Sequence, residues 1–169
     1  VRDLKDAAQH LGVTEGCAAF VAELCYLSGL VAIDADETIA PTNTFDIWLT
    51  QDFESKWQNL VSLWLITSRV SGLVGRSDQK FSALGPELDR VSAANIRNRI
   101  LDELRINIEL SPTPDTFIER MKWLAPLRRG SNLRDDLVKW TLEECEWLGI
   151  TGLGALSTFA AELLDGDDD

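Results

Sequence analysis

The sequence has few of the residue types that perform catalysis or hold metal ions. It contains one histidine, His10, and three cysteines, Cys17, Cys25 and Cys145, among 169 residues. The spacing of the cysteines matches no zinc pattern, and their odd number among apolar residues indicates buried, reduced thiols rather than a disulfide framework. We therefore expect no metal site and no cofactor.

Motifs for chemistry are also missing. The segment "GLVGRSD" (72–78) lacks the Lys-Ser/Thr ending of a phosphate loop, and no serine lies in a nucleophile elbow. The paired carboxylates at 135–136 and 143–144 are best interpreted as solvated helix faces, because adjacent helical residues point in different directions. The acidic residues at 34–37 lack the central glycine and final glutamate of a calcium loop. We expect this chain to have no enzymatic activity of its own.

The chain has no long apolar run and no targeting signal. No window approaches the 18 or more consecutive apolar residues of a membrane span, and the N-terminus lacks the pattern of a signal peptide. We expect a cytoplasmic protein without a membrane partner. Because the chain begins with Val1 rather than Met, we expect it to be part of a longer protein.

Positive charge is scarce at both ends. The net charge of −12 divides into −7 for residues 1–60, +3 for residues 61–140 and −8 for residues 141–169. Nucleic acids are bound largely through Lys and Arg, so both ends would repel DNA and only the middle could attract it.

The first residues predict a helix-turn-helix. Apolar residues at 4, 7, 8 and 11 follow the spacing of an amphipathic helix, and Gly12 ends it. Thr14 is a good N-cap for a second helix that ends near Gly29. "LVAID" and "TIAPT" then predict two strands around an acidic turn, which completes the helix–turn–helix–wing order typical of winged-helix proteins.

Further helices follow the expected wing. The next helix is predicted over 52–68, where Trp57 and Trp64 share one face and suit a core. The second half predicts helices over 92–106, 113–126 and 133–150, a reduced wing near 150–158 and a last helix at 159–164. Thr42–Leu49 aligns without gaps with Ser157–Leu164, which indicates a weak repeat, although any mostly helical chain can yield such a coincidence.

The expected fold class is mainly α with short β-hairpins, arranged as tandem winged-helix-like units. The first unit spans 1–68 and lacks a leading helix. A glycine- and proline-containing connecting loop covers 69–91, the second unit covers 92–164, and an acidic tail covers 165–169.

The second helix of the first unit does not carry residues suited to reading DNA. Such helices present Arg, Gln, Asn, Ser or Lys to base edges, whereas this one offers apolar and acidic side chains. We expect this face to meet a protein partner or another domain of the parent chain. The partner-facing residues are Glu15, Ala18, Ala19 and Glu23.

Any contact with DNA would come from the basic middle of the chain. Surface arginines balanced by nearby carboxylates remain an alternative interpretation of the same residues. The candidate nucleic-acid-binding set is Arg97, Arg99, Arg105, Arg120, Lys122, Arg128, Arg129 and Arg134.

Two segments resemble a known family. "GLVAIDADETIAPTNTFDIWL" with the Trp-rich helix after it, and "EWLGITGLGALSTFAAELL" near the end, are similar to the N-terminal winged-helix-like region of XPB-type helicases and bacterial helicase-associated proteins. Asn43 and Phe45 depart from that pattern, where Pro and Gly are common. The resemblance implies an accessory domain of a larger DNA-transacting protein, and it carries over no catalytic residue.

Three hypotheses follow. The first is a non-catalytic, helicase-associated accessory domain that acts as a protein-interaction scaffold with at most weak DNA contact. The second is a winged-helix DNA-binding transcription regulator, which would need a basic reading surface. The third is a protein-interaction module with no role at DNA.

Overall fold

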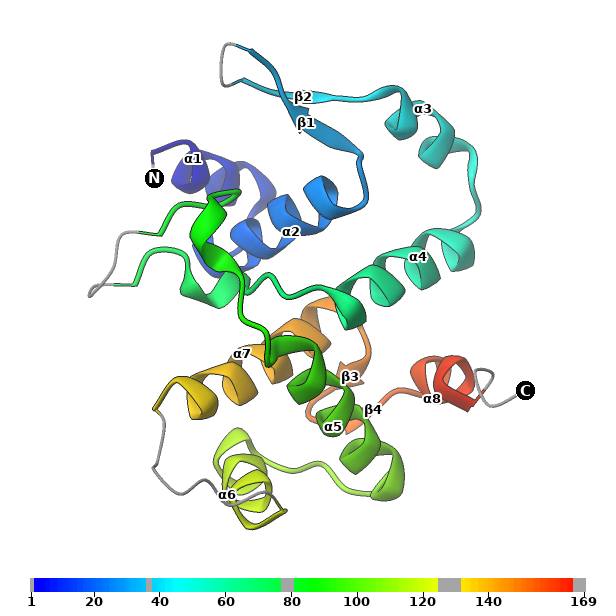
Figure 1. Cartoon of the computed structure of the whole chain (residues 1–169). Helices are drawn as coiled ribbons and strands as arrows, with labels where there is room; N and C mark the ends of the chain where they lie inside the picture. Colours follow the sequence, from blue (N-terminus) through cyan, green and yellow to red (C-terminus); the bar gives the residue numbers. More distant parts are fainter. Residues whose placement is uncertain (1, 36–37, 77–80, 125–131, 166–169) are drawn as a thin grey trace. The chain divides into compact units, whose positions relative to one another are not determined.

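The computed structural model of the chain describes residues 2–35, 38–76, 81–124 and 132–165 (Figure 1). The protein is mostly helical and carries two small antiparallel hairpins, which confirms the mainly α class with short hairpins. The chain divides into two compact units, Val1–Val91 and Ser92–Asp169. Residues 69–91, expected to be a connecting loop, belong to the first unit.

The first unit is built around the α2 helix. Its elements are α1 (Arg2–Leu11), α2 (Glu15–Leu27), β1 (Val31–Ile33), β2 (Ile39–Pro41), α3 (Asn43–Thr50), α4 (Phe53–Ile66) and the 3-10 turns η1 (Ser71–Leu73) and η2 (Pro86–Leu88). β1 pairs with β2 with Ile33 opposite Ile39. α1, α4 and η1 all pack against α2.

Local sequence signals set the ends of these helices. The left-handed Gly12 ends α1, and the Thr14 hydroxyl accepts the Cys17 N–H at 3.2 Å at the start of α2. Asp52 caps α4 by accepting the Ser55 N–H at 2.8 Å. The cap predicted at Thr14 is therefore present, and Asp52 plays the same role for α4.

The core of the first unit gathers the apolar stripes of α2 and α4. Trp57, Val61 and Trp64, spaced four and three residues apart, are buried along α4, as predicted for the two tryptophans. The segment after α4 adds further apolar side chains to this core. Its buried members are Val70, Leu73 and Leu88.

The second unit is built around α7. Its elements are α5 (Ala93–Ile106), α6 (Pro114–Leu124), α7 (Asn132–Leu148), β3 (Thr151–Gly152), β4 (Ala155–Leu156) and α8 (Thr158–Asp165). α5 and α6 pack on α7, and α5 also contacts β4. The predicted helices and the reduced hairpin are present. The core residues include Ile100, Leu104, Met121, Val138, Cys145 and Ile150.

The backbone that follows the central helix, α2 in the first unit and α7 in the second, forms the same turn in both units. In the first unit, the Leu30 N–H donates to the Cys25 carbonyl at 2.9 Å. In the second unit, the Ile150 N–H donates to the Cys145 carbonyl at the same distance. Each helix therefore ends with the same hydrogen bond before its hairpin begins.

A glycine and a hydroxyl residue complete this shared arrangement. Gly29 and Gly149 have φ values of 68° and 71°, a left-handed conformation that favours glycine. The Thr42 hydroxyl donates to the Gly29 carbonyl at 2.5 Å, and the Ser157 hydroxyl donates to the Gly149 carbonyl at 2.9 Å. The residue that starts the helix after each hairpin therefore also ties the hairpin closed.

Candidate functional site

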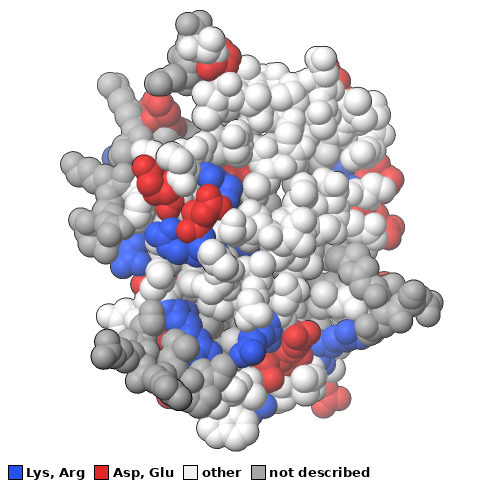
Figure 2. Space-filling view, viewed as in Figure 1, with Lys and Arg blue, Asp and Glu red and all other residues white. Residues whose placement is uncertain are grey.

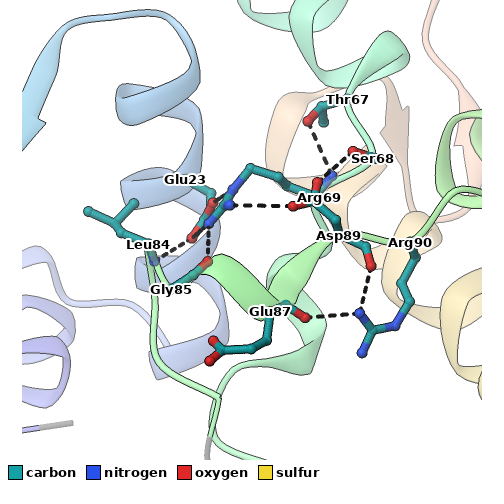
Figure 3. Close-up of polar contacts among 9 residues, drawn as sticks. All are labelled: Glu23, Thr67, Ser68, Arg69, Leu84, Gly85, Glu87, Asp89 and Arg90. Atoms are coloured by element: carbon teal, nitrogen blue, oxygen red, sulfur yellow. Dashed lines mark hydrogen bonds and ion pairs between the residues drawn. The ribbon is translucent and has the colours of Figure 1, made fainter.

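The middle of α2 carries a buried carboxylate that binds another part of the first unit (Figure 3). Glu23 is 3% exposed and accepts hydrogen bonds from Arg69 Nε at 2.5 Å and from the Leu84 N–H at 2.6 Å. Arg69 Nη2 also donates to the Gly85 carbonyl at 2.9 Å. The Glu23–Arg69 pair therefore holds two parts of the segment after α4, at Arg69 and at Leu84–Gly85, against α2.

Backbone contacts support the same segment. The Val70 N–H donates to the Leu88 carbonyl at 3.0 Å, and the Ser68 hydroxyl donates to Asp89 at 2.6 Å. The hydrogen bond to Glu23 raises the pKa of the Arg69 guanidinium, so the positive charge is stabilised where it lies. Residues 68–76 and 81–89 thus form a cover over one face of α2.

This cover corrects the expected partner-facing set. Glu15 is exposed, but Ala18, Ala19 and Glu23 are buried within the first unit. The face that they share packs against the protein's own core, because α4, η1 and the cover segment lie over it. Of the four predicted residues, Glu15 alone is available to a partner.

The basic set begins with a residue that is not on the surface. Arg97 is 2% exposed, and its Nε lies 3.6 Å from a carboxylate oxygen of the equally buried Glu144. Burial lowers the pKa of Arg97, because removing the guanidinium from water disfavours its charged form. This arginine belongs to the core of the second unit and cannot contact a phosphate, which corrects the prediction.

Two further cations pair with carboxylates on the surface. Arg120 Nε donates to Glu103 at 3.0 Å. Lys122 Nζ lies 3.0 Å from Glu119 and 3.1 Å from Asp135, and these two hydrogen bonds raise its pKa. Figure 2 shows blue and red side chains lying side by side in the same manner. The positive charge of these residues is therefore largely offset by their neighbours.

The remaining members of the basic set differ in exposure. Arg99 is exposed, Arg105 is half-buried, and Arg134 donates to the Met121 carbonyl at 2.9 Å. Arg128 and Arg129 lie outside the described residues. The described members do not form a continuous basic surface, since one is buried and others are engaged with acceptors.

One cleft of the second unit lies between residues 111–114, α7 and the β3–β4 hairpin. This cleft of about 420 Å³ is lined by Ser111, Leu142, Glu143 and Glu146, among others. Glu146 accepts the N–H groups of the hairpin turn, including that of Gly154 at 2.7 Å, so it closes the turn. Nothing in this lining pairs a nucleophile with a base.

The metal-binding residue types are dispersed. Among the residues that the structure describes, no three His, Cys, Asp or Glu side chains gather as a metal site would need. The three cysteines are free thiols, but Cys17 and Cys25 are half-buried rather than fully buried as predicted. Burial raises the pKa of all three thiols, so they are poor nucleophiles at neutral pH.

Sequence reasoning did not identify Arg69 as a partner of Glu23. The signal was a lone acidic residue between the apolar Phe20 and Leu24 on the inward stripe of α2. A carboxylate in such a position needs a cationic partner, because unpaired buried charge is costly. The identity of the partner depended on a contact far along the chain.

Comparison of the chain with protein-family models, with curated proteins and with solved structures gave no match. A search of the described helices for one long and apolar enough to cross a membrane also found none.

Proposed function

We propose that this chain is a non-catalytic accessory domain of a larger helicase-associated or DNA-transacting cytoplasmic protein. It acts as a protein-interaction scaffold of two winged-helix-like units and makes at most weak contact with DNA. The repeated helix–glycine–hairpin–helix arrangement supports the tandem units, since the hydrogen bonds at Gly29 and Gly149 correspond one to one.

One observation carries this proposal: the inward face of α2 is covered by the chain's own Arg69-containing segment. In a DNA-reading winged helix the second helix of the motif enters the major groove and presents polar side chains to it. Here Glu23 and Arg69 bind each other, and the exposed start of the helix offers Glu15. The helix serves packing within its own unit, which disfavours the alternative of a transcription regulator.

The pairing of the basic residues supports weak rather than tight DNA binding. Phosphate binding requires cations that can exchange their counterions for the phosphate backbone. Arg120 and Lys122 already hold protein carboxylates, and Arg97 is buried. Arg99 is the described member of the set whose exposure suits phosphate contact best.

The test is fluorescence anisotropy with labelled single-stranded, duplex and forked DNA at low and physiological salt. Arg99→Glu and Arg128→Glu/Arg129→Glu are measured beside the wild type. We expect weak binding at low salt that is lost at physiological salt and reduced in the charge-reversal variants. Tight, salt-resistant binding to one duplex sequence would overturn the proposal in favour of a regulator.

A further inference from the structure

Exposed apolar side chains lie on the hairpin, on α3 and at the start of α4 in the first unit. We call this surface the apolar arm and define it as β1, β2, α3 and Phe53 at the start of α4. All eight residues of α3 are described, and none of them is buried. Figure 2 shows a broad, mostly white face with red side chains at its edges where Figure 1 places these elements. Its exposed apolar side chains, between 44% and 75% accessible, are Ile33, Ile39, Ile47, Leu49 and Phe53.

A helix as short as α3 gains little stability by itself. Isolated helices shorter than about 12 residues are marginal in water. On one side of this helix Phe45 stacks on Trp48, and Lys56 of α4 places its ammonium group 4.8 Å from the Trp48 ring. The opposite side carries Ile47, which is 64% exposed, and Leu49 lies elsewhere around the helix and is 53% exposed. The arm therefore presents a preformed face whose burial would be favourable.

The second unit shows what covers the corresponding elements there. In that unit the hairpin and the following helix have buried residues, Leu156 and Ala160. A helix supplies part of the cover, because α5 packs against both α7 and β4. In the first unit neither strand has a buried residue. The comparison indicates that a helix is the kind of element that fits the bare arm.

The charge around the apolar arm indicates which kind of helix would bind it. Residues 26–58 contain six Asp or Glu and one Lys, and that Lys56 is engaged with Trp48 and with the Leu49 carbonyl at 3.3 Å. Asp46, Asp52 and the apolar residues between them therefore lie in a negative field. Two copies of the arm placed face to face would repel each other, whereas a helix with Lys and Arg beside its apolar stripe would be attracted.

We propose that the apolar arm docks an amphipathic helix of a partner protein whose polar face is basic. Ile47 and Phe53 provide the apolar contacts, and Asp46 and Asp52 meet the cationic rim. This mode of recognition lays the apolar face of a helix on an exposed hydrophobic surface. The inference rests on the proposed scaffold function and names the partner class for it.

The experiment uses the full chain and a fluorescein-labelled synthetic helix of leucine and lysine, about 18 residues long so that it forms a helix. A scrambled peptide of the same composition lacks the apolar face, and a leucine/glutamate version reverses the charge. The protein variants are Ile47→Ser/Phe53→Ser and the matched control Ile66→Ser, since Ile66 is as exposed as Phe53 but ends the same helix. Circular dichroism checks that each variant is folded.

We expect the leucine/lysine peptide to bind wild type and Ile66→Ser alike and to bind the double variant at least about tenfold more weakly. If the peptide bound the double variant as tightly as the wild type, the proposal would be overturned. The same holds if the wild type bound the scrambled peptide equally well, because charge alone would then explain the attraction. Self-association of the wild type that the double variant abolishes would also overturn it, in favour of a second copy. Weak DNA binding together with no peptide binding would refute helix docking on the apolar arm and would leave the proposed scaffold function in place.

Discussion

Glu23 and Arg69 lie 46 residues apart in the sequence, yet Arg69 Nε donates to the Glu23 carboxylate at 2.5 Å. The same carboxylate accepts the Leu84 N–H, so one side chain holds three separate segments together. Because Glu23 is buried and the Arg69 side chain is 13% exposed, water cannot readily replace either partner. This pair explains why the face of α2 centred on Glu23 is closed to a partner.

We expect Glu23→Leu to lower the free energy of unfolding of the first unit by about 2–4 kcal/mol, because it leaves a nearly buried guanidinium without its carboxylate. Urea denaturation followed by tryptophan fluorescence measures the change. Glu15→Leu, on the exposed start of the same helix, is the control and should stay within about 0.5 kcal/mol of wild type. Similar losses in the two variants would contradict a special role for the pair.

The buried pair Arg97 and Glu144 permits a double-mutant test. Glu144→Leu alone should destabilise the second unit by about 3–5 kcal/mol, since it strands a buried positive charge. The double variant Arg97→Met/Glu144→Leu should recover much of that loss, because no charge then remains in the core. Strictly additive losses in the denaturation midpoints would show that the two side chains do not depend on each other.

The two hydroxyl groups that close the hairpins should contribute similarly to their units. Thr42→Ala and Ser157→Ala each remove a side-chain hydrogen bond to a glycine carbonyl and a cap of the following helix. We expect a loss of about 1–2 kcal/mol from each, measured by thermal unfolding. Thr44→Ala and Thr158→Ala, exposed neighbours in the same helices, are the controls. A loss in one unit alone would argue against equivalent roles.

The buried thiol of Cys145 should make stability depend on pH in the alkaline range. Burial raises its pKa in the folded protein above the unfolded value of about 8.5. The folded state therefore keeps its full stability below that pH and loses it as the pH rises further, because the unfolded chain can ionise and the folded one cannot. Between pH 7 and pH 10 the urea midpoint of Cys145→Ala should fall less steeply than that of the wild type. Parallel curves for the two proteins would refute this prediction.

Local sequence patterns were sufficient to predict most of the elements. The helix expected over 52–68 is α4, Phe53–Ile66, and its cap at Asp52 and its buried Trp57 and Trp64 follow from spacing. Such features depend on residues within a few positions of one another. Phe53 shows the limit of such patterns: it stands four residues before the buried Trp57, the spacing of one helix face, yet it is 75% exposed.

The candidate site was less predictable because exposure depends on distant segments. Arg97 and Arg99 stand two residues apart on α5 and have the same chemistry, yet one is buried beside Glu144 and the other is exposed. Residues 69–91 show weak periodicity and suggested a linker. The described part of this segment covers α2 because Arg69 binds a carboxylate on that helix, far away in the sequence.

The sequence by itself determined the helices and the two hairpins, because these depend on local periodicity and on turn residues. Only the tertiary structure decided that Ala18, Ala19 and Glu23 are buried, that Arg97 is a core residue and that the arm around α3 is bare. The physical reason is that burial and charge pairing are set by contacts between segments far apart in the chain, and local patterns do not specify those contacts.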